Sequence, residues 1–528
     1  MKYNPPVCIL TAGLGKRMGS EYNYINKSLL PFDTCAMISN IISNFSSNTD
    51  FIIALGHKRK QVIEYLEIAH PKINFIFINV KNYNKIGSGP AHSLNCCKKK
   101  LQKPFYFVAC DTLFYPDKKI NYKENYVGVS KINKSEKKEY CNFVIKDNLV
   151  INIKDKINTI ESTLAFTGFL YVYDYKIFWK GINNLRTSSK EKQISSGLKL
   201  LIKESKLNIL HGKWIDTGTK RKYKEAKNIE TSYNFEKTNE FIYFVNNKVI
   251  KFYADKNIVK KRIKKTKINS KVFPNILNNS NQFYSYKYIN GKTLYDYNNF
   301  KIFNNLIIWL DKNLWFDVKV DKNKFKKNCF NFYYTKTINR FNLFKKKYPK
   351  FNSPKTINGE KVFKINDILD RINWVKLSNG KPTFIHGDLQ FDNIIYDKTN
   401  DKFTLIDWRE DFDGNIKSGD MYYDLSKLMG GMILNYSLIK KNEFKLYDKN
   451  GHINIDFGTN FIHDSFIQKL NSFIISKNMD TDKVITIVSL IFLNMSPLHH
   501  PPFDKVLYYL SILQMTKLIN KKNKFFLS

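Results

Sequence analysis

Arginine and acidic residues are scarce in this chain of 528 residues. Lys and Arg number 87 against 46 Asp and Glu, a formal net charge of +41, and only 8 of the basic residues are Arg. A basic surface attracts phosphate backbones, but Arg is the residue that binds phosphates bidentately and stacks on bases. The shortage of Arg therefore argues against a nucleic-acid binder. A positive field still favours small phosphorylated anions.

The sequence also lacks a long apolar run. No stretch reaches the ~18–20 uninterrupted apolar residues that cross a bilayer, and the best candidate, Val484–Leu493, is too short and predicts a buried helix. The first residues have no basic start followed by an apolar run, so no secretory signal is expected. The seven cysteines are scattered, without zinc spacing. We expect reduced thiols, a cytoplasmic location and no membrane insertion.

Two large domains are expected from the length, and 43% hydrophobic residues exclude disorder as the main state. From Val7 to about Ala226, short apolar runs alternate with helical stretches, which predicts a doubly wound, parallel, Rossmann-like α/β sheet. The expected strands are Val7–Leu10, Phe51–Leu55, Phe75–Asn79 and Phe105–Ala109. The expected helices are Ala36–Phe45, Lys58–Ile68 and Ala91–Leu101.

The second half opens differently. A strand pair is expected at Phe241–Val245 and Lys248–Tyr253, turning at Asn246–Asn247, and the chain from Phe303 onward is expected to be largely helical. The polar segment between the halves has no apolar period. The expected division is a first domain at 1–228, a linker at 229–238 and a second domain at 239–528.

A glycine-rich loop follows the first strand. Residues 11–19 read TAGLGKRMG, so Gly13 and Gly15 are followed directly by Lys16 and Arg17. Glycines let a loop turn tightly and present N–H groups to phosphate oxygens, a helix start adds its dipole, and the two cations suit a triphosphate. The plain alternative is an ordinary strand-to-helix turn.

Further motifs favour the nucleotide site. Lys27 lies in NKSLLP at 26–31, Gly87 and Ser88 open a predicted helix, Asp111 ends a predicted strand, and residues 214–219 read WIDTGT. Ligands of open α/β sheets collect at such strand ends. From Val7 to about Lys227, the chain resembles the sugar-phosphate nucleotidyltransferase superfamily. It is most similar in length to compact members such as phosphocholine cytidylyltransferase and N-acetylmuramate-1-phosphate uridylyltransferase.

This resemblance implies site roles and a cofactor, Mg²⁺. The triphosphate would be contacted by Gly13, Gly15, Lys16 and Arg17, and the nucleobase by Gly87 and Ser88. Lys27 would stabilise charge on the phosphates. The metal ligands would be Asp111 and Asp216. An acceptor phosphate oxygen would attack the α-phosphorus and pyrophosphate would leave, a step between anions that needs cations more than an acid–base pair. Two departures leave the substrate open, because Asn26 replaces a proline and Cys110 a common glycine.

A second constellation lies in the later half. Residues 384–393 read FIHGDLQFDN, so Asp388 and Asn393 are five apart in a loop, and Asp407 ends the next predicted strand, which pairs back as a hairpin. A hydroxyl that attacks ATP needs an oriented base and oxygen ligands for Mg²⁺, and two carboxylates and an amide supply both. A single polar residue in a loop often only stabilises the turn, but turn formation does not explain the whole set of three residues at this spacing.

This block resembles the choline kinase and aminoglycoside phosphotransferase family, which has a protein-kinase-like, two-lobed α+β fold. The match extends to residues 419–425, GDMYYDL, and the hinge between lobes is expected at 285–291. The resemblance implies that Asp388 is the catalytic base, that Asn393 and Asp407 hold Mg²⁺, and that Lys251 binds ATP. His386 and Asp424 are expected to pack the loop.

The N-terminal part of this second match is weaker. No glycine occurs between Gly218 and Gly291, so there is no glycine-rich loop over the phosphates. No glutamate occurs between Glu240 and Glu360, so Lys251 lacks the usual helix-borne partner, with Asp255 as an untested substitute. The sequence therefore leaves open whether this kinase-like part is active or degenerate.

Together the two halves predict consecutive steps. A small alcohol would be phosphorylated with ATP, and the phosphomonoester would then be coupled to an NTP, CTP or UTP, for cell-surface glycan or lipid synthesis. The favoured pair is a choline-type acceptor with CTP, by resemblance of both halves to the choline pathway. The alternatives are a sugar kinase joined to a sugar-1-phosphate nucleotidyltransferase, or an active transferase with a degenerate kinase module. The oligomeric state stays unknown.

Overall fold

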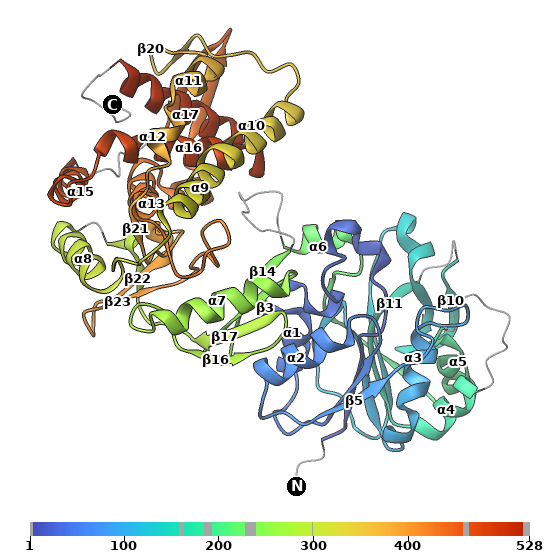
Figure 1. The fold of residues 1–528 in the computed structure, drawn as a ribbon. Coiled ribbons are helices and arrows are strands. Elements are labelled where there is room, and N and C mark those ends of the chain that lie inside the picture. Colours follow the sequence, from blue (N-terminus) through green and yellow to red (C-terminus); the bar gives the residue numbers. More distant parts are fainter. Residues whose placement is uncertain are drawn as a thin grey trace. The chain divides into compact units, whose positions relative to one another are not determined.

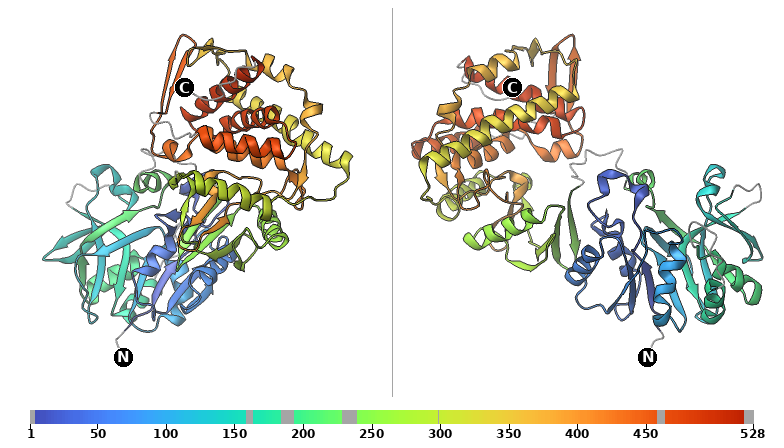
Figure 2. Two further views of the ribbon diagram at one scale, coloured as in Figure 1. Left: turned by 90° about the vertical axis from the view of Figure 1, so that its left-hand side faces the viewer. Right: turned by 45° about the vertical axis from the view of Figure 1, so that its right-hand side comes forward.

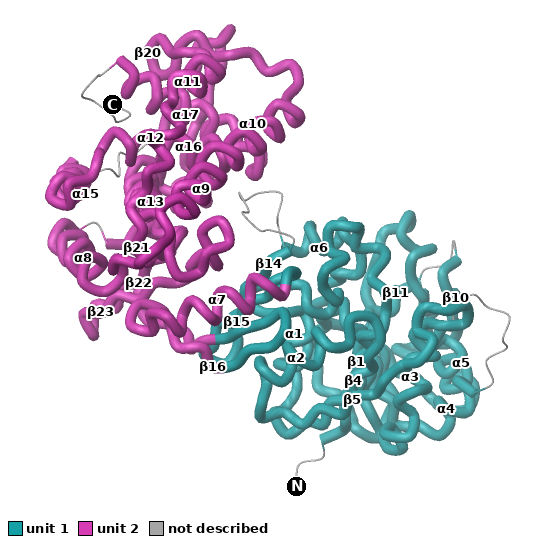
Figure 3. Tube along the Cα trace, in the orientation of Figure 1, with its two compact units in different colours: residues 1–230, 236–255, 278–285 teal, residues 231–235, 256–277, 286–528 magenta. Residues whose placement is uncertain are grey.

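The computed structural model describes residues 4–157, 163–183, 193–227, 239–297, 299–457 and 464–520. The linker expected at 229–238 lies outside the described residues. The described chain divides into two compact units that do not follow the order of the sequence (Figure 3). The first unit takes residues up to 227 together with 239–255 and 278–285, and the second takes 256–277 and the residues from 286 onward.

A twisted sheet forms the centre of the first unit (Figure 1). It has nine strands in the order β5-β4-β1-β6-β11-β8-β12-β10-β9. Its parallel part is β1 (Val7–Leu10), β4 (Phe51–Leu55), β5 (Phe75–Asn79) and β6 (Phe105–Ala109), with the bounds expected from the sequence. The rest comprises β8 (Asn125–Ser130), β9 (Cys141–Lys146), β10 (Leu149–Asp155), β11 (Leu164–Val172) and β12 (Leu207–Leu210). These strands pair antiparallel except for β8 with β12, so the sheet is mixed and not wholly parallel as expected.

Helices cover both faces of this sheet. On one face α1 (Met37–Ser43) and α2 (Arg59–Ala69) contribute to one hydrophobic cluster. On the other face the second cluster includes α3 (Pro90–Cys97), α4 (Tyr175–Asn183) and α5 (Ser195–Glu204). The three helices expected from the sequence are present as α1, α2 and α3, and the sheet is doubly wound. The third is shorter than expected, since it ends at Cys97 and a 3-10 turn follows at Lys98–Lys100.

Short elements complete the part that bears the first site. The 3-10 turns are η1 (Lys16–Met18), η2 (Ser20–Tyr22), η3 (Lys27–Leu29), η4 (Lys98–Lys100) and η5 (Lys134–Glu139). The short strands are β2 (Pro31–Phe32), β3 (Cys35–Ala36), β7 (Thr112–Pro116) and β13 (Gly212–Asp216), and α6 (Lys220–Ala226) follows β13. Strands β7 and β13 pair antiparallel, with Asp216 opposite Thr112.

A four-stranded sheet from the second half of the sequence has the order β14-β15-β17-β16. Its strands are β14 (Glu240–Val245), β15 (Lys248–Tyr253), β16 (Ile276–Asn279) and β17 (Phe283–Lys287). The predicted hairpin is confirmed: Asn246 and Asn247 both have positive φ, 50° and 58°, as a two-residue turn of type I′ requires. Five buried side chains of β14, β15 and β17 join the cluster of α1 and α2, namely Phe241, Tyr243, Ile250, Phe252 and Phe283.

The second unit is mainly helical (Figure 2). Its helices are α7 (Lys256–Ile268), α8 (Phe300–Asn313), α9 (Lys322–Phe330), α10 (Lys336–Lys347), α11 (Ile365–Arg371), α12 (Trp374–Leu377), α13 (Met421–Ile433), α14 (Tyr436–Lys440), α15 (Asp464–Ser476), α16 (Thr481–Met495) and α17 (Phe503–Ile519). Its strands are β18 (Lys292–Thr293), β19 (Thr356–Ile357), β20 (Glu360–Lys361), β21 (Pro382–Thr383), β22 (Ile394–Asp397), β23 (Lys402–Leu405), β24 (Gly419–Asp420), β25 (Lys445–Lys449) and β26 (His452–Asp456). Its remaining short helical turns are η6 (Leu294–Asp296), η7 (Asn331–Thr335), η8 (Phe391–Asn393) and η9 (Ser496–Leu498).

Helix α16 is the apolar helix that the sequence predicted. The segment Thr481–Leu498 is the one part of the described chain that is long and apolar enough to cross a membrane, and 56% of it is buried. Helices α13 and α17 pack against α16, and the side chains of Val484 and Leu493 are fully buried. It is therefore a core helix of the second unit, as expected.

Candidate active sites

The glycine loop follows β1, which lies where the order of strands in the sheet reverses. The chain runs from β1 through β4 to the edge strand β5 and then returns to β6 on the other side of β1. Leu10 and Ala109 are paired at the carboxyl ends of β1 and β6, so the loop after Leu10 and the residues after Ala109 meet at one edge of the sheet. Such a switch point is where open α/β sheets bind ligands.

The loop itself has room for a ligand. A Cβ added to Gly13 would meet no atom within 4 Å, and Gly15 has a φ of 68°, which favours glycine. Lys16 and Arg17 are exposed. The helix expected after the loop is absent: the next residues form only the 3-10 turn η1, with a second such turn after Gly19. This loop can therefore bind phosphates through its backbone N–H groups and its two cations, without the dipole of an α-helix.

Lys27 and Asp111 form an ion pair at the same edge. Lys27 Nζ lies 2.7 Å from Asp111 Oδ2, and the two side chains are 19% and 17% exposed. Burial alone would lower the pKa of Lys27, but the carboxylate of Asp111 outweighs it and the pKa is raised. Burial likewise raises the pKa of Asp111, but Lys27 outweighs it and the pKa is lowered. Both groups are therefore charged at neutral pH.

Asp216 joins this pair because β13 pairs with β7. A Cβ on Gly218 would lie 3.0 Å from Asp216 Oδ1, 3.1 Å from Asp111 Oδ2 and 3.7 Å from a guanidinium nitrogen of Arg17. Five of the predicted residues therefore lie around Gly218 or in the loop beside it, namely Gly15, Arg17, Lys27, Asp111 and Asp216. A Cβ added to Gly15 would lie 3.7 Å from the Cβ of Lys27. Only glycine at 218 leaves this point open.

The two carboxylates suit a divalent cation. Burial first, and the charge of Asp111 after it, raise the pKa of Asp216 to about 6, although the N–H of Gly218 works against them. Among the described residues no group of three or more His, Cys, Asp or Glu could hold a metal. Mg²⁺ is commonly bound through one or two carboxylates plus substrate phosphates, and this pair fits that mode.

Three residues at this site were missed by the sequence analysis. Tyr140 donates a hydrogen bond to Asp216 Oδ2, Lys222 Nζ lies 3.2 Å from the same oxygen and 4.2 Å from the centre of the Tyr140 ring, and Thr217 donates to the carbonyl of Asp111. Lys222 carried a weak signal, since it follows the WIDTGT motif within one helical turn. Tyr140 is 76 residues from Asp216 and carried none.

The predicted nucleobase turn lies at the start of α3. Gly87 and Gly89 have positive φ values of 81° and 139°, and Ser88 N donates to the carbonyl of Lys85. Pro90 begins the helix. The sequence therefore predicted this turn and its helix correctly, and the base contact of Gly87 and Ser88 stays a prediction.

In the second unit, a buried aspartate holds the loop that carries Asp388. Asp424 accepts hydrogen bonds from the N–H groups of His386 and Gly387, both 2.7 Å, and from the indole of Trp315, 3.2 Å. Nδ1 of His386 accepts from Asp388 N, while Nε2 lies 2.9 Å from the carbonyl of Ile406. Asp424 and His386 are fully buried and make the contacts of packing residues.

Asp388 pairs with a lysine that the sequence analysis missed. Lys427 Nζ lies 2.8 Å from Asp388 Oδ1, and Lys427 stands three residues after Asp424 on the buried helix α13. Burial raises the pKa of Asp388, but the charge of Lys427 outweighs it and the pKa is lowered. Asn393 Nδ2 donates to the carbonyl of Asp388 at 2.8 Å, so the two predicted residues are in contact.

Asp407 follows β23, which pairs with β22 as the predicted hairpin. It has a φ of 56°, and its Oδ1 accepts a hydrogen bond of 2.7 Å from Arg262 on α7. The arginine is 8% exposed and the aspartate 35%. Helix α7, which contains no glutamate that could pair with Lys251, therefore supplies the cation of Arg262 to Asp407. Lys251 is buried on β15 in the first compact unit, whereas Asp388, Asn393 and Asp407 belong to the second.

Two family models match the chain. Residues 7–123 match the MobA-like NTP transferase domain, and residues 353–440 match the phosphotransferase enzyme family. The chain therefore contains one segment that is similar to an NTP transferase domain and one that is similar to a phosphotransferase domain. This confirms the family resemblance and the fold class expected from the sequence, an α/β nucleotidyltransferase domain followed by a kinase-like domain.

Solved structures similar to the transferase domain include nucleotide-sugar enzymes. A UDP-glucose pyrophosphorylase complexed with UDP-glucose is 17% identical, covers 43% of this chain and 98% of its own, and has a TM-score of 0.38. A putative glucose-1-phosphate thymidylyltransferase from Bacillus anthracis is 21% identical, covers 44% and 98%, and has a TM-score of 0.36. A UTP-bound enzyme of the first kind from Acinetobacter baumannii is 15% identical, covers 43% and 94%, and has a TM-score of 0.36. No curated protein matches the chain.

Proposed function

We propose that the chain is a bifunctional enzyme that makes a phosphomonoester in its phosphotransferase domain and consumes it in its transferase domain. The cluster of Lys27, Asp111, Asp216 and Arg17 at the carboxyl ends of β1 and β6 carries the proposal. Two cations and two carboxylates around an open point suit a reaction between a triphosphate and a second anion. The Asp388 loop supports the phosphorylation step.

In the transferase step an oxygen of the acceptor phosphate forms a bond to the α-phosphorus of the NTP. The bond from that phosphorus to the bridging oxygen breaks, and pyrophosphate leaves with the electron pair. Lys27 and Arg17 offset the growing negative charge, and the N–H groups of the glycine loop orient the phosphates. Mg²⁺ held by Asp111 and Asp216 would supply further charge neutralisation.

In the phosphotransferase step Asp388 accepts the proton of the substrate hydroxyl as the hydroxyl oxygen forms a bond to the γ-phosphorus of ATP. The bond from that phosphorus to the β,γ-bridging oxygen breaks, and ADP leaves with the electron pair. Lys427 keeps this carboxylate ionised, and Asp424 fixes the loop backbone on both sides of Gly387. Lys251 would bind the ATP phosphates, and Mg²⁺ held by Asn393 and Asp407 would shield the transferred group. The product, a phosphomonoester and ADP, is the acceptor class that the transferase step needs.

A choline-type alcohol and CTP are the favoured substrates, and UTP with a sugar is the alternative. The choice rests on the resemblance of both domains to enzymes of the choline pathway. A cationic alcohol needs an aromatic cage and a carboxylate, whereas a sugar needs polar groups. The activated headgroup would supply cell-surface glycan or lipid synthesis from a cytoplasmic enzyme.

Two substitutions test the division of labour. Asp111→Ala is expected to abolish pyrophosphate release and to leave ATP-dependent phosphorylation intact, because Asp111 and Asp407 lie in separate compact units. Asp407→Ala is expected to do the reverse. Each variant is its own folding control through the activity that it retains. Loss of both activities in either folded variant would contradict the proposal.

One observation favours a second candidate, an active transferase with a phosphotransferase domain that only binds. Arg262 neutralises the carboxylate of Asp407 that a metal would use. Under this candidate the wild-type protein forms no ADP with any alcohol, and Asp388→Asn changes nothing measurable in phosphorylation. ADP formation that depends on both an alcohol and Asp388 would exclude it.

A further inference from the structure

Asn26, the residue that departs from the family motif, is the centre of a buried hydrogen-bond network. Its side chain is fully buried, and Nδ2 donates to the carbonyls of Thr11 at 2.9 Å and His57 at 2.7 Å. Oδ1 accepts from the backbone N–H of Ser28 at 3.0 Å and from its hydroxyl at 2.8 Å. One amide thus ties the end of β1, the end of β4 and the turn η3 together.

This network fixes the backbone at Lys27. Asn26 is the N-cap of η3, which begins at Lys27, so its contact with Ser28 sets the direction in which the lysine leaves the turn. A proline at this position has no side-chain amide and no N–H, and could make none of these contacts. The Asn is therefore a different way to hold the same lysine.

Gln61 of α2 continues the network. Its Oε1 accepts a 3.0 Å hydrogen bond from the backbone N–H of Asn26, and its side chain is 6% exposed. Its Nε2 donates to the carbonyl of Tyr24 at 2.8 Å and to Oε1 of Gln282 at 2.9 Å. Both ends of this amide are used, so Gln61 links the turn that carries Lys27 to Gln282.

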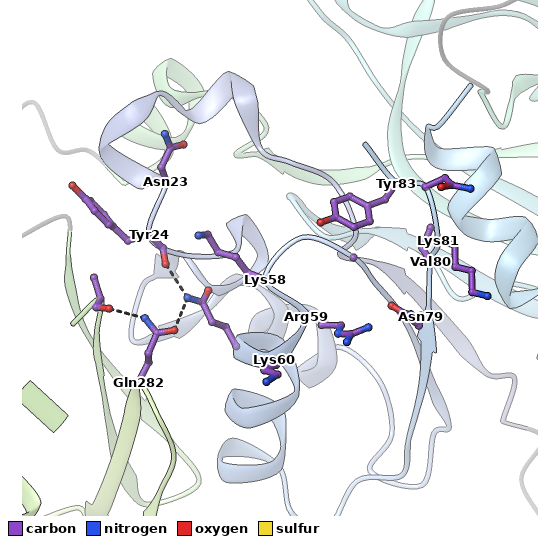
Figure 4. Close-up of a pocket in the computed structure, with 14 residues that line it drawn as sticks. Asn23, Tyr24, Lys58, Arg59, Lys60, Asn79, Val80, Lys81, Tyr83 and Gln282 are labelled. Carbon is purple, nitrogen blue, oxygen red and sulfur yellow. Dashed lines mark hydrogen bonds between the residues drawn. The ribbon is translucent and has the colours of Figure 1, made fainter. Parts of the chain in front are cut away.

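Gln282 comes from the second half of the sequence. It precedes β17, and its Nε2 donates to the carbonyl of Ala254, the residue after β15. Gln282 and Tyr24 lie on one side of a pocket of about 860 Å³ whose other lining side chains include Lys58, Lys60 and Lys81 (Figure 4). All of these residues belong to the first compact unit.

We propose that Gln61 and Gln282 are positioning residues for Lys27, acting through Asn26. The β14–β17 sheet, which resembles part of a kinase, then serves the transferase reaction as well. The proposal rests on the proposed function, because it assumes that Lys27 acts on the phosphates. Loss of Gln282 removes one of the two acceptors of Gln61 Nε2, leaves only the carbonyl of Tyr24 to hold that end of the amide, and so loosens the hydrogen bond to Asn26 N.

The test uses the full-length protein and the variants Gln61→Ala, Gln61→Glu, Gln282→Ala and the double variant. With the NTP and acceptor that the wild type uses, Gln282→Ala is expected to lower the transferase kcat by about ten- to a hundredfold, as misplaced groups do, and to change the KM for NTP little. ATP-dependent phosphorylation stays at the wild-type level. Gln61→Glu keeps the acceptor for Asn26 N and is expected to lie between Gln61→Ala and the wild type.

The double variant separates positioning from independent effects. Because both residues act through one hydrogen bond, Gln282→Ala is expected to add nothing in the Gln61→Ala background. Additive losses would overturn the proposal. Matched controls are Lys60→Ala, which lies next to Gln61 and lines the same pocket, and Asn281→Ala, which lies next to Gln282; both are expected to keep the wild-type kcat.

Amide hydrogen exchange gives a readout that needs no substrate. The amides of Lys27, Ser28 and Leu29 are expected to exchange faster in Gln282→Ala and in Gln61→Ala than in the two controls. Unchanged exchange would overturn the proposal whether or not the wild type releases pyrophosphate. A wild type that releases none with any pair contradicts the proposed function instead, so the two failures are distinguishable.

Discussion

At the scale of single residues, both proposed sites contain a partly buried pair of lysine and aspartate. Lys27 lies 2.7 Å from Asp111, and Lys427 lies 2.8 Å from Asp388. In each pair the lysine keeps a poorly solvated carboxylate ionised, so that oxygen is ready for a metal or a proton. Arg is scarce in the chain, yet Arg262 lies 2.7 Å from Asp407, and Arg17 lies 3.7 Å from the point beside Gly218 around which Asp111 and Asp216 meet.

Lys27→Met tests the first pair. The variant keeps the length of the side chain and removes its charge, so we expect the transferase kcat to fall by about 10²–10³, the usual effect of removing one group that stabilises transition-state charge. The KM for NTP should change less. Steady-state pyrophosphate release measures both quantities. A variant with wild-type kcat would remove Lys27 from the reaction.

Arg262→Met tests the pairing of Asp407. A hydrogen bond to a charged group stabilises by roughly 1.5–3 kcal/mol, so its loss should lower the Mg²⁺ concentration for half-maximal phosphorylation by about ten- to a hundredfold. Phosphorylation measured over a Mg²⁺ titration gives this value. A higher Mg²⁺ requirement would mean that Arg262 supports metal binding and does not compete with it.

At the scale of elements, the sequence predicted best where the pattern was local. The strands β1, β4, β5 and β6 have the predicted bounds because each is a short apolar run next to a polar turn. The Asn246–Asn247 hairpin was equally clear from its turn residues. The strands β8 to β12 were not predicted, since their pairing depends on partners up to 82 residues away, such as Asn125 and Leu207.

The candidate sites show the same division. Motif residues such as Lys27, Asp111 and Asp216 were found from their order along the chain. Tyr140 and Arg262 were not, because each reaches its aspartate only through the tertiary fold. The expected α-helix after the glycine loop was wrong, because Gly19 divides the segment into two 3-10 turns.

The β14–β15 hairpin is expected to be part of the first fold. Tyr243 donates to the carbonyl of Leu29 at 2.7 Å, and its ring packs against Tyr65 with centroids 5.0 Å apart. A fragment of residues 1–228 would expose this apolar face. We expect it to bind a hydrophobic dye and to melt well below the full chain. A soluble fragment with full transferase activity would contradict this expectation.

His70 gives the same region a pH dependence. Burial, and the charge of Lys248 after it, lower the pKa of His70 to about 4, and Ser39 lies 2.8 Å from Nε2. The pKa of His70 is lower in the folded than in the unfolded state. Its contribution to the free energy of unfolding is therefore fully present above pH ~6.5 and falls as the pH drops toward 4, by about 2 kcal/mol at pH 5. Chemical denaturation at pH 7.5 and 5 should show a smaller loss for His70→Gln. Equal losses would contradict it.

At the scale of the whole molecule, the proposed function places two consecutive reactions in one chain. Fusion would then supply both activities in equal amounts and raise the local concentration of the phosphomonoester. The five apolar side chains of β14, β15 and β17 that complete the first core come from the part of the chain expected to form the second domain. The expected domain boundary at residue 239 therefore does not follow the boundary between the compact units.

Mg²⁺ removal is expected to stop both reactions in the same sample. Neither site contains three protein ligands of the usual kinds among the described residues, so the metal should come and go with the nucleotide. Chelation followed by gel filtration should leave a folded protein, by circular dichroism, and added Mg²⁺ should restore both activities. Unfolding on chelation would mean that a metal has a structural role.

Pyrophosphate release by the purified protein tests the central claim most directly. CTP, UTP, GTP and dTTP are each offered with Mg²⁺ and phosphocholine, phosphoethanolamine or a sugar 1-phosphate, and the parent alcohol of the productive acceptor is then offered with ATP. We predict one productive pair, CTP with phosphocholine, followed by ADP formation from choline and, with both nucleotides present, pyrophosphate from choline itself. A folded protein that binds no nucleotide and releases no pyrophosphate with any pair would contradict the account.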